Sequence, residues 1–246
     1  MTKMVKAMLN GEFEIIIPEH RAARPEWYSE DGWEKARLET LYGLIKNQIE
    51  LDGISVVYYV GAEEGEMPAL CQMWGAKVLL FEPNPKVWSN TRAIWEANKL
   101  KTPYCFEGFA SNEDKLLQEE GVFLAPSWPQ SAYNEIEAAH GFKELHLEGG
   151  NYSQIKLDTV EGLIHVPPTI ITMDVEGSEF EVLKGSEAIL KKYKPDIVLS
   201  LHPEFLFHQW GVYGAEVRGW IKNIGYKETL LDYQHEVHLL YEAIDE

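Results

Sequence analysis

Short apolar runs separated by helical patterns constrain the fold of this 246-residue chain more than any other feature of its sequence. The runs are rich in β-branched and aromatic residues and have the length of strands. They cover residues 55–60, 77–81, 104–107, 169–173 and 196–201. Strands that alternate with helices form right-handed crossovers. The sequence therefore predicts an α/β fold with a doubly wound, mainly parallel sheet and helices on both faces.

The segments after these strands have the apolar spacing of helices. We expect helices over residues 63–74, 85–98, 178–192 and 212–223. The third is expected to be interrupted near Gly185 and Ser186. The C-terminal stretch, residues 226–244, departs from this rhythm and predicts two strands around a tight turn near residues 232–235. The sheet is therefore expected to end in an antiparallel hairpin.

Two regions lie outside the predicted sheet. Residues 1–50 contain a possible hairpin at Asn10 and Gly11 and an amphipathic helix over 33–49, and we expect this segment to cap the sheet edge or the ligand crevice. Residues 112–157 form a long insertion rich in Trp, Tyr, His and Asn, and long excursions of this kind often act as lids. With no internal repeat or flexible linker, residues 1–246 are expected to form a single domain.

Charge and composition exclude several classes of function. The formal charge is −18, from 22 Lys and Arg against 40 Asp and Glu, which disfavours a nucleic-acid partner. No segment approaches the ~20 apolar residues of a membrane-spanning helix, and the N-terminus has no signal-type apolar run. Cys71 and Cys105 lack metal-ligand spacing, so we interpret them as free thiols. A cytoplasmic protein that binds neither membrane nor nucleic acid is expected.

Residues that directly follow the predicted strands should lie at the ligand crevice of a parallel sheet. The turn Gly61-Ala62-Glu63-Glu64-Gly65 follows the first strand, and Glu82 follows the second, 21 residues after Gly61. An acidic residue at this spacing suits the ribose hydroxyls of either a dinucleotide or another adenosine cofactor. The G-x-G-x-x-G pattern is absent, and two glutamates beside a pyrophosphate would be unfavourable.

S-adenosylmethionine fits this turn better, because it has no phosphate and carries an ammonium and a sulfonium at its methionine end. Glu63 and Glu64 would then be tolerable or helpful. The alternative is that each of them only complements the positive end of a helix dipole.

Four segments in order and spacing carry a family resemblance: "VVYYVGAEEGEMPAL", "VLLFEPNP", "IITMDVEGSEFEVLKGSEAIL" and "PDIVLSLHPE". They resemble the FkbM-type S-adenosylmethionine-dependent methyltransferases of the class I methyltransferase fold, from about residue 55 to the C-terminus. The "DVEG-x-E-x-x-x-L-x-G" stretch is the most specific part. The resemblance implies a Rossmann-like, seven-stranded sheet with a reversed last strand. It also implies methyl transfer to oxygen, often a hydroxyl of a sugar, a glycan or a small natural product.

The resemblance also implies cofactor-binding residues. The turn would approach the methionine part, Glu82 would hold the ribose, and the stretch after the third strand would lie along the adenine. The expected set is Tyr59, Gly61, Ala62, Glu63, Gly65, Glu82, Pro83, Asn84, Gly108, Phe109, Ala110, Ser111, Asp174, Val175 and Glu176. Tyr59 departs from the family, which usually has Asp there, so Glu63 is expected to take over the contact with the ammonium of the cofactor.

Methyl transfer requires an in-line acceptor and removal of its proton. Asp174 is the first candidate for the base or the acceptor-orienting group, with His202 and Glu204 as second choices. His202 can equally be a structural residue at a strand end, and Glu176 and Glu179 can simply be acidic residues of a first helical turn. Asp174 with nearby carboxylates could also hold a divalent metal such as Mg²⁺, although no metal is predicted.

Several aromatic and polar residues of the insertion could contact a glycan ring; they are Tyr133, Asn134, His140 and Tyr152. The predicted function is thus an S-adenosylmethionine-dependent O-methyltransferase that acts on a small hydroxylated or glycosylated acceptor. Two alternatives stay open. One is a catalytically silent methyltransferase-like binding module, suggested by Tyr59 and the acidic surface. The other is a NAD-dependent oxidoreductase, which the turn pattern disfavours.

Overall fold

The computed structural model of the chain describes residues 2–23, 34–116, 126–136, 152–233 and 236–244. Its strands are β1 (Met4–Leu9), β2 (Phe13–Pro18), β3 (Val56–Val60), β4 (Lys77–Phe81), β5 (Tyr104–Phe106), β6 (Phe109–Ala110), β7 (Gln154–Ile155), β8 (Ile170–Met173), β9 (Asp196–Leu201), β10 (Tyr226–Tyr233) and β11 (Val237–Ala243). Its helices are α1 (Glu19–Ala22), α3 (Lys35–Asp52), α4 (Glu66–Met73), α5 (Trp88–Ala97), the 3-10 helix η1 (Gln130–Tyr133), α6 (Leu157–Ile164), α7 (Glu179–Lys184), α8 (Glu187–Tyr193), α9 (Pro203–Trp210) and α10 (Gly214–Asn223).

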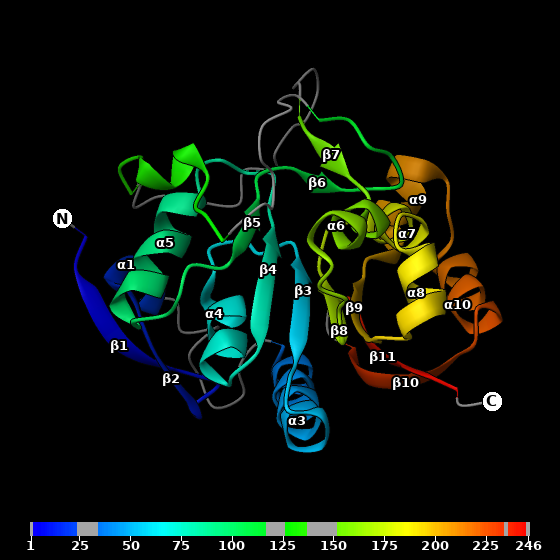
Figure 1. Cartoon of the computed structure of the whole chain (residues 1–246), viewed down its shortest axis with the longest axis horizontal. Coiled ribbons are helices and arrows are strands. Elements are labelled where there is room, and N and C mark those ends of the chain that lie inside the picture. The colour runs from blue at the N-terminus through cyan, green and yellow to red at the C-terminus, as the bar shows by residue number, and fades with distance from the viewer. Residues whose placement is uncertain (1, 24–33, 117–125, 137–151, 234–235, 245–246) are drawn as a thin grey trace.

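A seven-stranded sheet in the order β10-β11-β9-β8-β3-β4-β5 forms the centre of the molecule (Figure 1). The pairs β3·β4, β3·β8, β4·β5 and β8·β9 are parallel, whereas β11 runs antiparallel to both β9 and β10. The last strand, β11, thus lies between β9 and β10 and runs in the opposite direction to both. The predicted mainly parallel sheet with an antiparallel C-terminal hairpin is confirmed.

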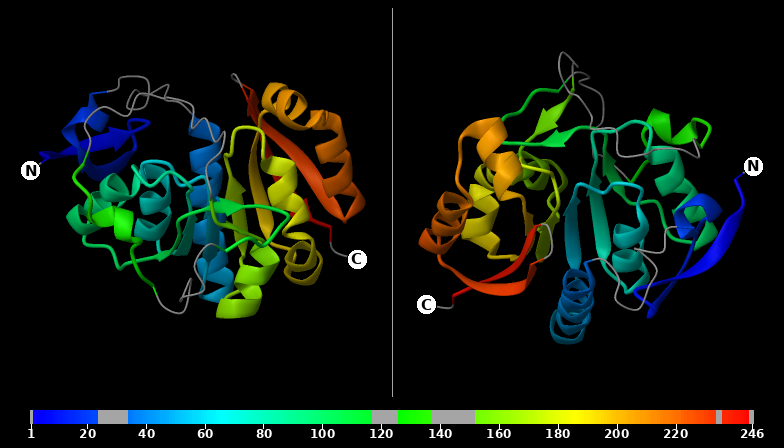
Figure 2. Two further views of the ribbon diagram at one scale, coloured as in Figure 1. Left: turned by 90° about the horizontal axis from the view of Figure 1, so that it is seen from above. Right: turned by 180° about the vertical axis from the view of Figure 1, so that it is seen from behind.

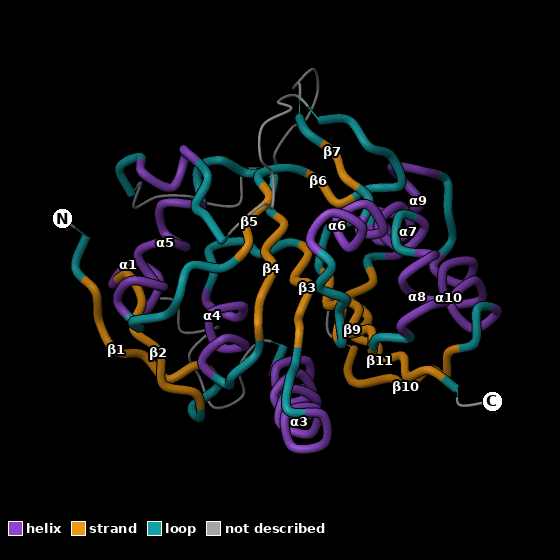
Figure 3. The backbone as a smooth tube through the Cα atoms, in the orientation of Figure 1, coloured by secondary structure: helices purple, strands orange, loops and turns teal. Residues whose placement is uncertain are grey.

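Side chains from β3 point alternately to two hydrophobic cores, one on each face of the sheet. Tyr58 belongs to the core covered by α6 to α10, and Tyr59 to the core covered by α3, α4, α5 and the hairpin of β1 and β2. Figure 3 shows the orange strands between these two groups of purple helices. Because all five residues of β3 are buried, the strand reads as a continuous apolar run rather than an alternating one.

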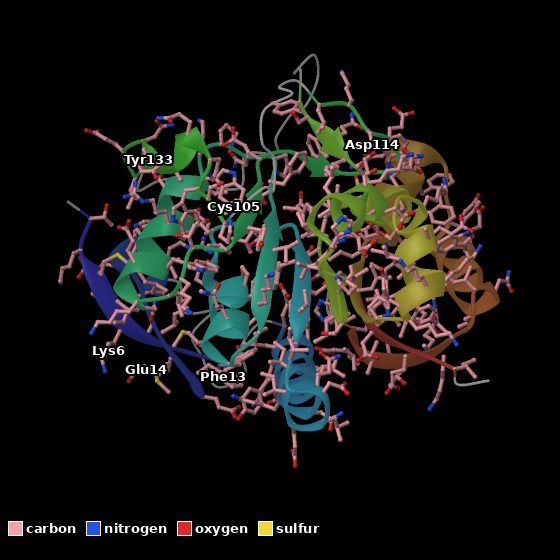
Figure 4. All side chains as sticks on the ribbon, in the orientation of Figure 1. Lys6, Phe13, Glu14, Cys105, Asp114 and Tyr133 are labelled. Carbon is pink, nitrogen blue, oxygen red and sulfur yellow. The ribbon has the colours of Figure 1, made fainter. Side chains whose placement is uncertain are left out.

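The N-terminal segment forms a separate hairpin that packs on the helices rather than on the sheet. Asn10 and Gly11 make its turn with positive φ angles of 52° and 69°. The side chain of Asn98 ties the hairpin to the end of α5, because it accepts from the N–H of Ile16 at 3.0 Å and donates to the carbonyl of Ile16 at 2.7 Å. Figure 4 shows Lys6 and Glu14 on its outer side. The expected hairpin and the following helix, α3, are both present.

Among the described residues, four helices were not predicted: α6, α9, the one-turn α1 and the 3-10 helix η1. Helix α9 begins directly after His202 with a proline in its first turn, and α6 follows β7. The end of the 112–157 insertion joins the fold, because β7 pairs with β6 in parallel. Residues 117–125 and 137–151 of the insertion lie outside the described residues, so its role as a lid stays a prediction.

The cysteines and the hydropathy of the helices also bear on the sequence-based expectations. Cys71 and Cys105 are free thiols, as expected. No helix in the described ranges is long and apolar enough to cross a membrane.

Candidate active site

The glycine turn brings the ends of β3 and β8 into contact. Gly61 has a φ of +80°, and the N–H groups of Gly61 and Ala62 donate to the carbonyl of Phe81 at 2.9 and 3.2 Å. A Cβ on Gly61 would lie 1.9 Å from the carbonyl oxygen of Asp174. Only glycine fits here, for both its backbone conformation and the lack of space. The turn therefore places Asp174 directly beside it.

Glu82 is buried at the end of β4, where its carboxylate accepts two backbone hydrogen bonds. The N–H of Glu63 lies 2.9 Å from Oε2 and the N–H of Asn84 lies 2.8 Å from Oε1. Burial raises the pKa of Glu82 to about 7, despite these two donors. Each oxygen keeps a free lone pair, so this carboxylate can accept from a pair of vicinal hydroxyls.

The two glutamates of the turn have different surroundings. Glu64 is buried, accepts a hydrogen bond from the amide of Asn90 and lies 3.8 Å from Nη1 of Arg21. Glu63 has a φ of +46° and lines a cavity. Burial raises the pKa of Glu63 well above its ordinary value, and the nearby Asp174 adds to this rise. Of the two, only Glu63 is available to a ligand in the cavity.

This cavity is small, about 20 Å³, and lies between the glycine turn and the N-terminal segment. Tyr59, Glu63 and Asp174 line one side, and Arg37 and Glu34 come from the start of α3. Its carboxylates suit an ammonium or a sulfonium, whereas the guanidinium of Arg37 is already paired with Glu34 and Asp174. The carboxylates are thus compatible with the amino-acid end of S-adenosylmethionine, and Glu82 with its ribose.

Arg37 is the main residue of the site that sequence reasoning missed. It is 1% exposed, it pairs with Glu34, and its Nη1 donates to Oδ2 of Asp174 at 2.9 Å. Its Nη2 lies 3.4 Å from the hydroxyl of Tyr59, so the tyrosine that replaces the usual aspartate lies under a buried arginine. The sequence carried one signal, since Arg37 precedes Leu41 by four residues and therefore shares the apolar face of its helix.

A second missed group surrounds His202. Its Nδ1 lies 2.7 Å from Oε1 of Glu179, and its Nε2 lies 2.5 Å from Oε2 of Glu236 and 3.6 Å from Oδ1 of Asp174. Oε1 of Glu236 lies 2.9 Å from Nε2 of His238. Glu179 was interpreted as a first-turn acidic residue, and Glu236 and His238 were assigned only to the C-terminal hairpin. The strand order brings them together, because β11 pairs beside β9.

The charges in this group stabilise one another. Burial lowers the pKa of His202, but hydrogen bonds to Glu179 and Glu236 raise it to about 10. Burial would raise the pKa of Glu236, but hydrogen bonds from His202 and His238 hold it below its usual range. Burial raises the pKa of Asp174, and Arg37 offsets only part of this rise. At neutral pH His202 is thus a cation, and Asp174 is a stronger base than an ordinary aspartate.

Two triads here have the residue types and spacing for a metal ion, and they share Glu236. One is Asp174, His202 and Glu236, and the other is Glu34, Glu236 and His238. In each triad the ligand atoms lie within 4.8 Å of one another.

The stretch after β5 lies next to Glu82, as the adenine-binding role requires. The N–H of Gly108 donates to the carbonyl of Glu82 at 3.2 Å, and β6 follows. Residues 109–111, with Pro83 and Asn84, remain predictions as cofactor contacts. On the other side of the crevice, the carbonyl of Glu176 accepts from the side chain of Gln209 at 3.0 Å.

The remaining predicted residues are not gathered around Asp174. Glu204 is exposed on the first turn of α9. Tyr133 is exposed and lies under Arg92, whose guanidinium is 4.1 Å from its ring centre, and Figure 4 shows it beside α5. Asn134 is exposed next to it, and Tyr152 packs edge-on against Phe109 at 5.5 Å. His140 lies outside the described residues.

Comparison with protein families decides the class of this chain. The model of the Methyltransferase FkbM domain matches residues 58–228. The chain belongs to the FkbM methyltransferase family. This confirms the resemblance, the class I methyltransferase fold and a family that uses S-adenosylmethionine as cofactor. A comparison with curated proteins finds no match.

Solved methyltransferases share the fold of this FkbM family member. Methyltransferase FkbM from Methylobacillus flagellatus KT is 16% identical with a TM-score of 0.51, over 81% of this chain and 47% of that one. This chain thus spans about half of that protein. An rRNA methylase from Streptococcus thermophilus is 9% identical with a TM-score of 0.52, over 87% and 100%. SMU.1697c from Streptococcus mutans, in complex with SAH, is 10% identical with a TM-score of 0.50, over 85% and 98%. The structural likeness shows a common fold, although the sequences differ widely.

Proposed function

We propose that this protein is an S-adenosylmethionine-dependent O-methyltransferase that acts on a hydroxyl of a sugar, a glycan or a small natural product. The observation that carries the proposal is the contact between the Gly61 turn and Asp174, with Glu82 at the end of the adjacent strand. This arrangement supports a role of Glu82 as the acceptor for the ribose hydroxyls and of Asp174 as the base, one on each side of the glycine turn. The S. mutans neighbour, which holds SAH, has the same fold.

The cofactor would lie across the carboxyl ends of β3 and β4. Glu82 would accept from both ribose hydroxyls, and Glu63 would pair with the ammonium in place of the usual aspartate. Residues 108–111 would lie along the adenine. The cofactor supplies an electrophilic methyl group on a sulfonium. Arg37 would hold Asp174 in place through Oδ2 and leave Oδ1 for other partners.

Asp174 is the group best placed to take the acceptor proton. Its raised pKa makes it more basic, and it lies at the edge of the cavity. His202 has a pKa of about 10 and therefore cannot act as a base at neutral pH. Its charge would instead stabilise and orient the carboxylate of Asp174. Glu204, which is exposed, has less support as a catalytic residue.

The acceptor is expected to enter from the side of the 112–157 insertion. Tyr152 is the residue of the predicted acceptor set with the best support, because it contacts Phe109 of β6. Tyr133 and Asn134 lie earlier in the insertion, beside α5.

The test is methyl transfer from labelled S-adenosylmethionine to a panel of hydroxylated metabolites, glycosides and polyketides. The wild type should methylate a hydroxylated compound. Asp174→Asn should keep the affinity for S-adenosylhomocysteine and lose at least a hundredfold in turnover, as expected when a general base is removed. Asp52→Asn, an exposed aspartate at the end of α3, is the matched control. Full activity of Asp174→Asn would remove Asp174 from the mechanism, and cofactor binding with no transfer to any compound would favour a silent binding module.

A further inference from the structure

We propose that Asp174, His202 and Glu236 bind a divalent transition-metal ion such as Mn²⁺, Fe²⁺ or Zn²⁺. These residues come from the end of β8, the end of β9 and the start of β11, so the site exists only in the folded sheet. One imidazole and two carboxylates are a donor set for such ions, whereas Mg²⁺ prefers oxygen ligands alone. The metal would lie beside the cofactor site, at the point where an acceptor hydroxyl is expected.

The three ligand atoms already converge. Nε2 of His202 lies 3.6 Å from Oδ1 of Asp174 and 2.5 Å from Oε2 of Glu236. Two ligands of a tetrahedral metal at ~2.1 Å are roughly 3.4 Å apart. The distance between His202 and Asp174 therefore already suits two ligands of one ion. The distance between His202 and Glu236 would increase by about 1 Å when an ion replaced the proton between them.

The outer contacts of the triad are those that accompany metal-bound histidines. A ligating imidazole usually donates its other N–H to a carboxylate, which fixes the ring. Here Nδ1 of His202 lies 2.7 Å from Oε1 of Glu179, so Nε2 is directed at the two other carboxylates. Oε1 of Glu236 is similarly held by His238 at 2.9 Å. His202 is thus oriented by Glu179, and Glu236 by His238, and neither Glu179 nor His238 is a ligand in the proposed site.

The residues that orient the triad are themselves buried. Glu179 is fully buried and contacts Nδ1 of His202, and His238, also fully buried, contacts Oε1 of Glu236. Buried polar groups that are fixed in this way keep the ligand atoms in place.

The charge balance of the cluster also favours a cation. Four carboxylates, those of Glu34, Asp174, Glu179 and Glu236, surround one guanidinium and His202. Buried charges are stable only when they are paired or coordinate a metal. A divalent ion would supply the missing positive charge.

The catalytic use of this ion rests on the proposed function, but its binding does not. With the ion bound, His202 would be neutral and Asp174 a ligand, so the ion rather than the Asp174 base would activate the acceptor hydroxyl by binding it and lowering its pKa. It would also select acceptors that present a hydroxyl or a vicinal pair of hydroxyls to it.

The experiment titrates the full chain, stripped with a chelator, with Mn²⁺ and follows free Mn²⁺ by electron paramagnetic resonance. Co²⁺ provides a second readout, because its visible absorption reports coordination by protein ligands. Both titrations are made without cofactor or acceptor. The wild type should bind one equivalent of Mn²⁺. Glu236→Gln and His202→Gln should each weaken binding at least tenfold, and Glu179→Gln should weaken it by about ten- to a hundredfold.

Two variants control for unspecific effects. His208→Gln removes an exposed histidine of α9, and Glu39→Gln removes an exposed glutamate of α3; both should bind like the wild type. A circular dichroism spectrum establishes that each variant is folded. The proposal is overturned if the wild type binds no stoichiometric Mn²⁺ or Co²⁺, or if folded Glu236→Gln and His202→Gln bind as tightly as the wild type. Metal binding without methyl transfer would contradict only the proposed function.

Discussion

Arg37 and Asp174 are 137 residues apart in the sequence, yet Nη1 of one lies 2.9 Å from Oδ2 of the other. The pair joins the N-terminal helix α3 to the end of β8, inside the cavity beside the glycine turn. The same guanidinium contacts Tyr59, which stands where the family resemblance implies an aspartate. Arg37 lies between Tyr59 and two carboxylates, so the positive charge next to position 59 comes from the protein itself.

Replacing Arg37 by leucine should destabilise the fold, because it leaves Glu34 and Asp174 buried without their cation. Removing one partner of a buried ion pair costs about 3–5 kcal/mol. Chemical denaturation measures the free energy of unfolding. Lys35→Ala, at a half-exposed position on the same helix, should change it by less than about 0.5 kcal/mol. Equal stability of Arg37→Leu and wild type would show that the pair contributes nothing.

Gly61→Ala should prevent the glycine turn from packing on β8. The added Cβ would lie 1.9 Å from the carbonyl oxygen of Asp174 at a φ of +80°. We expect a lower melting temperature and at least a tenfold loss of affinity for S-adenosylhomocysteine. Gly43→Ala is the control, because nothing lies within 4 Å of its Cβ, and in a helix this change should stabilise by about 0.5–1 kcal/mol. A folded Gly61→Ala protein with normal affinity would contradict the packing described here.

Cofactor affinity should rise with pH through the titration of Glu82. Its pKa is about 7, so its ionised fraction increases about tenfold from pH 6 to pH 8. The ionised form is the better acceptor for two ribose hydroxyls. The dissociation constant of S-adenosylhomocysteine should therefore fall by up to about tenfold over this range. Glu82→Gln should bind weakly and with a flatter pH profile; an unchanged profile in this variant would assign the titration to another group.

Glu63 rather than Tyr59 should contact the ammonium of the cofactor. Tyr59→Phe loses only the 3.4 Å contact with Arg37, so affinity for S-adenosylhomocysteine should stay within about threefold of wild type. Glu63→Gln should weaken it about tenfold or more, as expected for a charged hydrogen bond. Calorimetry compares the two variants, and the reverse order would mean that the phenol of Tyr59 is the binding group.

Local patterns were sufficient to predict the parallel strands and the helix break at Gly185, because both depend on apolar runs and glycine placement within one segment. Gly61 and Glu82 were also predictable, since residues after parallel strands meet at one edge of the sheet. Helix α9 was missed because it follows β9 after a single residue, His202. No element was predicted between residues 201 and 212.

Arg37, Glu236 and His238 could not be assigned to the site from the sequence. Their roles depend on long-range packing: α3 must lie across the sheet, and β11 must pair next to β9 (Figure 2). A charged residue has the same one-letter code whether it is buried or exposed, so the sequence does not show which charged side chains are buried. Their partners become visible only when the strand order is known.

The central claim is that the crevice at Gly61, Glu82 and Asp174 binds S-adenosylmethionine. Isothermal titration calorimetry of the full chain with S-adenosylhomocysteine tests it most directly. One equivalent should bind with a micromolar dissociation constant, and Glu82→Ala should weaken binding at least a hundredfold while the protein stays folded. No heat and no thermal shift with the wild type, or undiminished binding by Glu82→Ala, would contradict the claim.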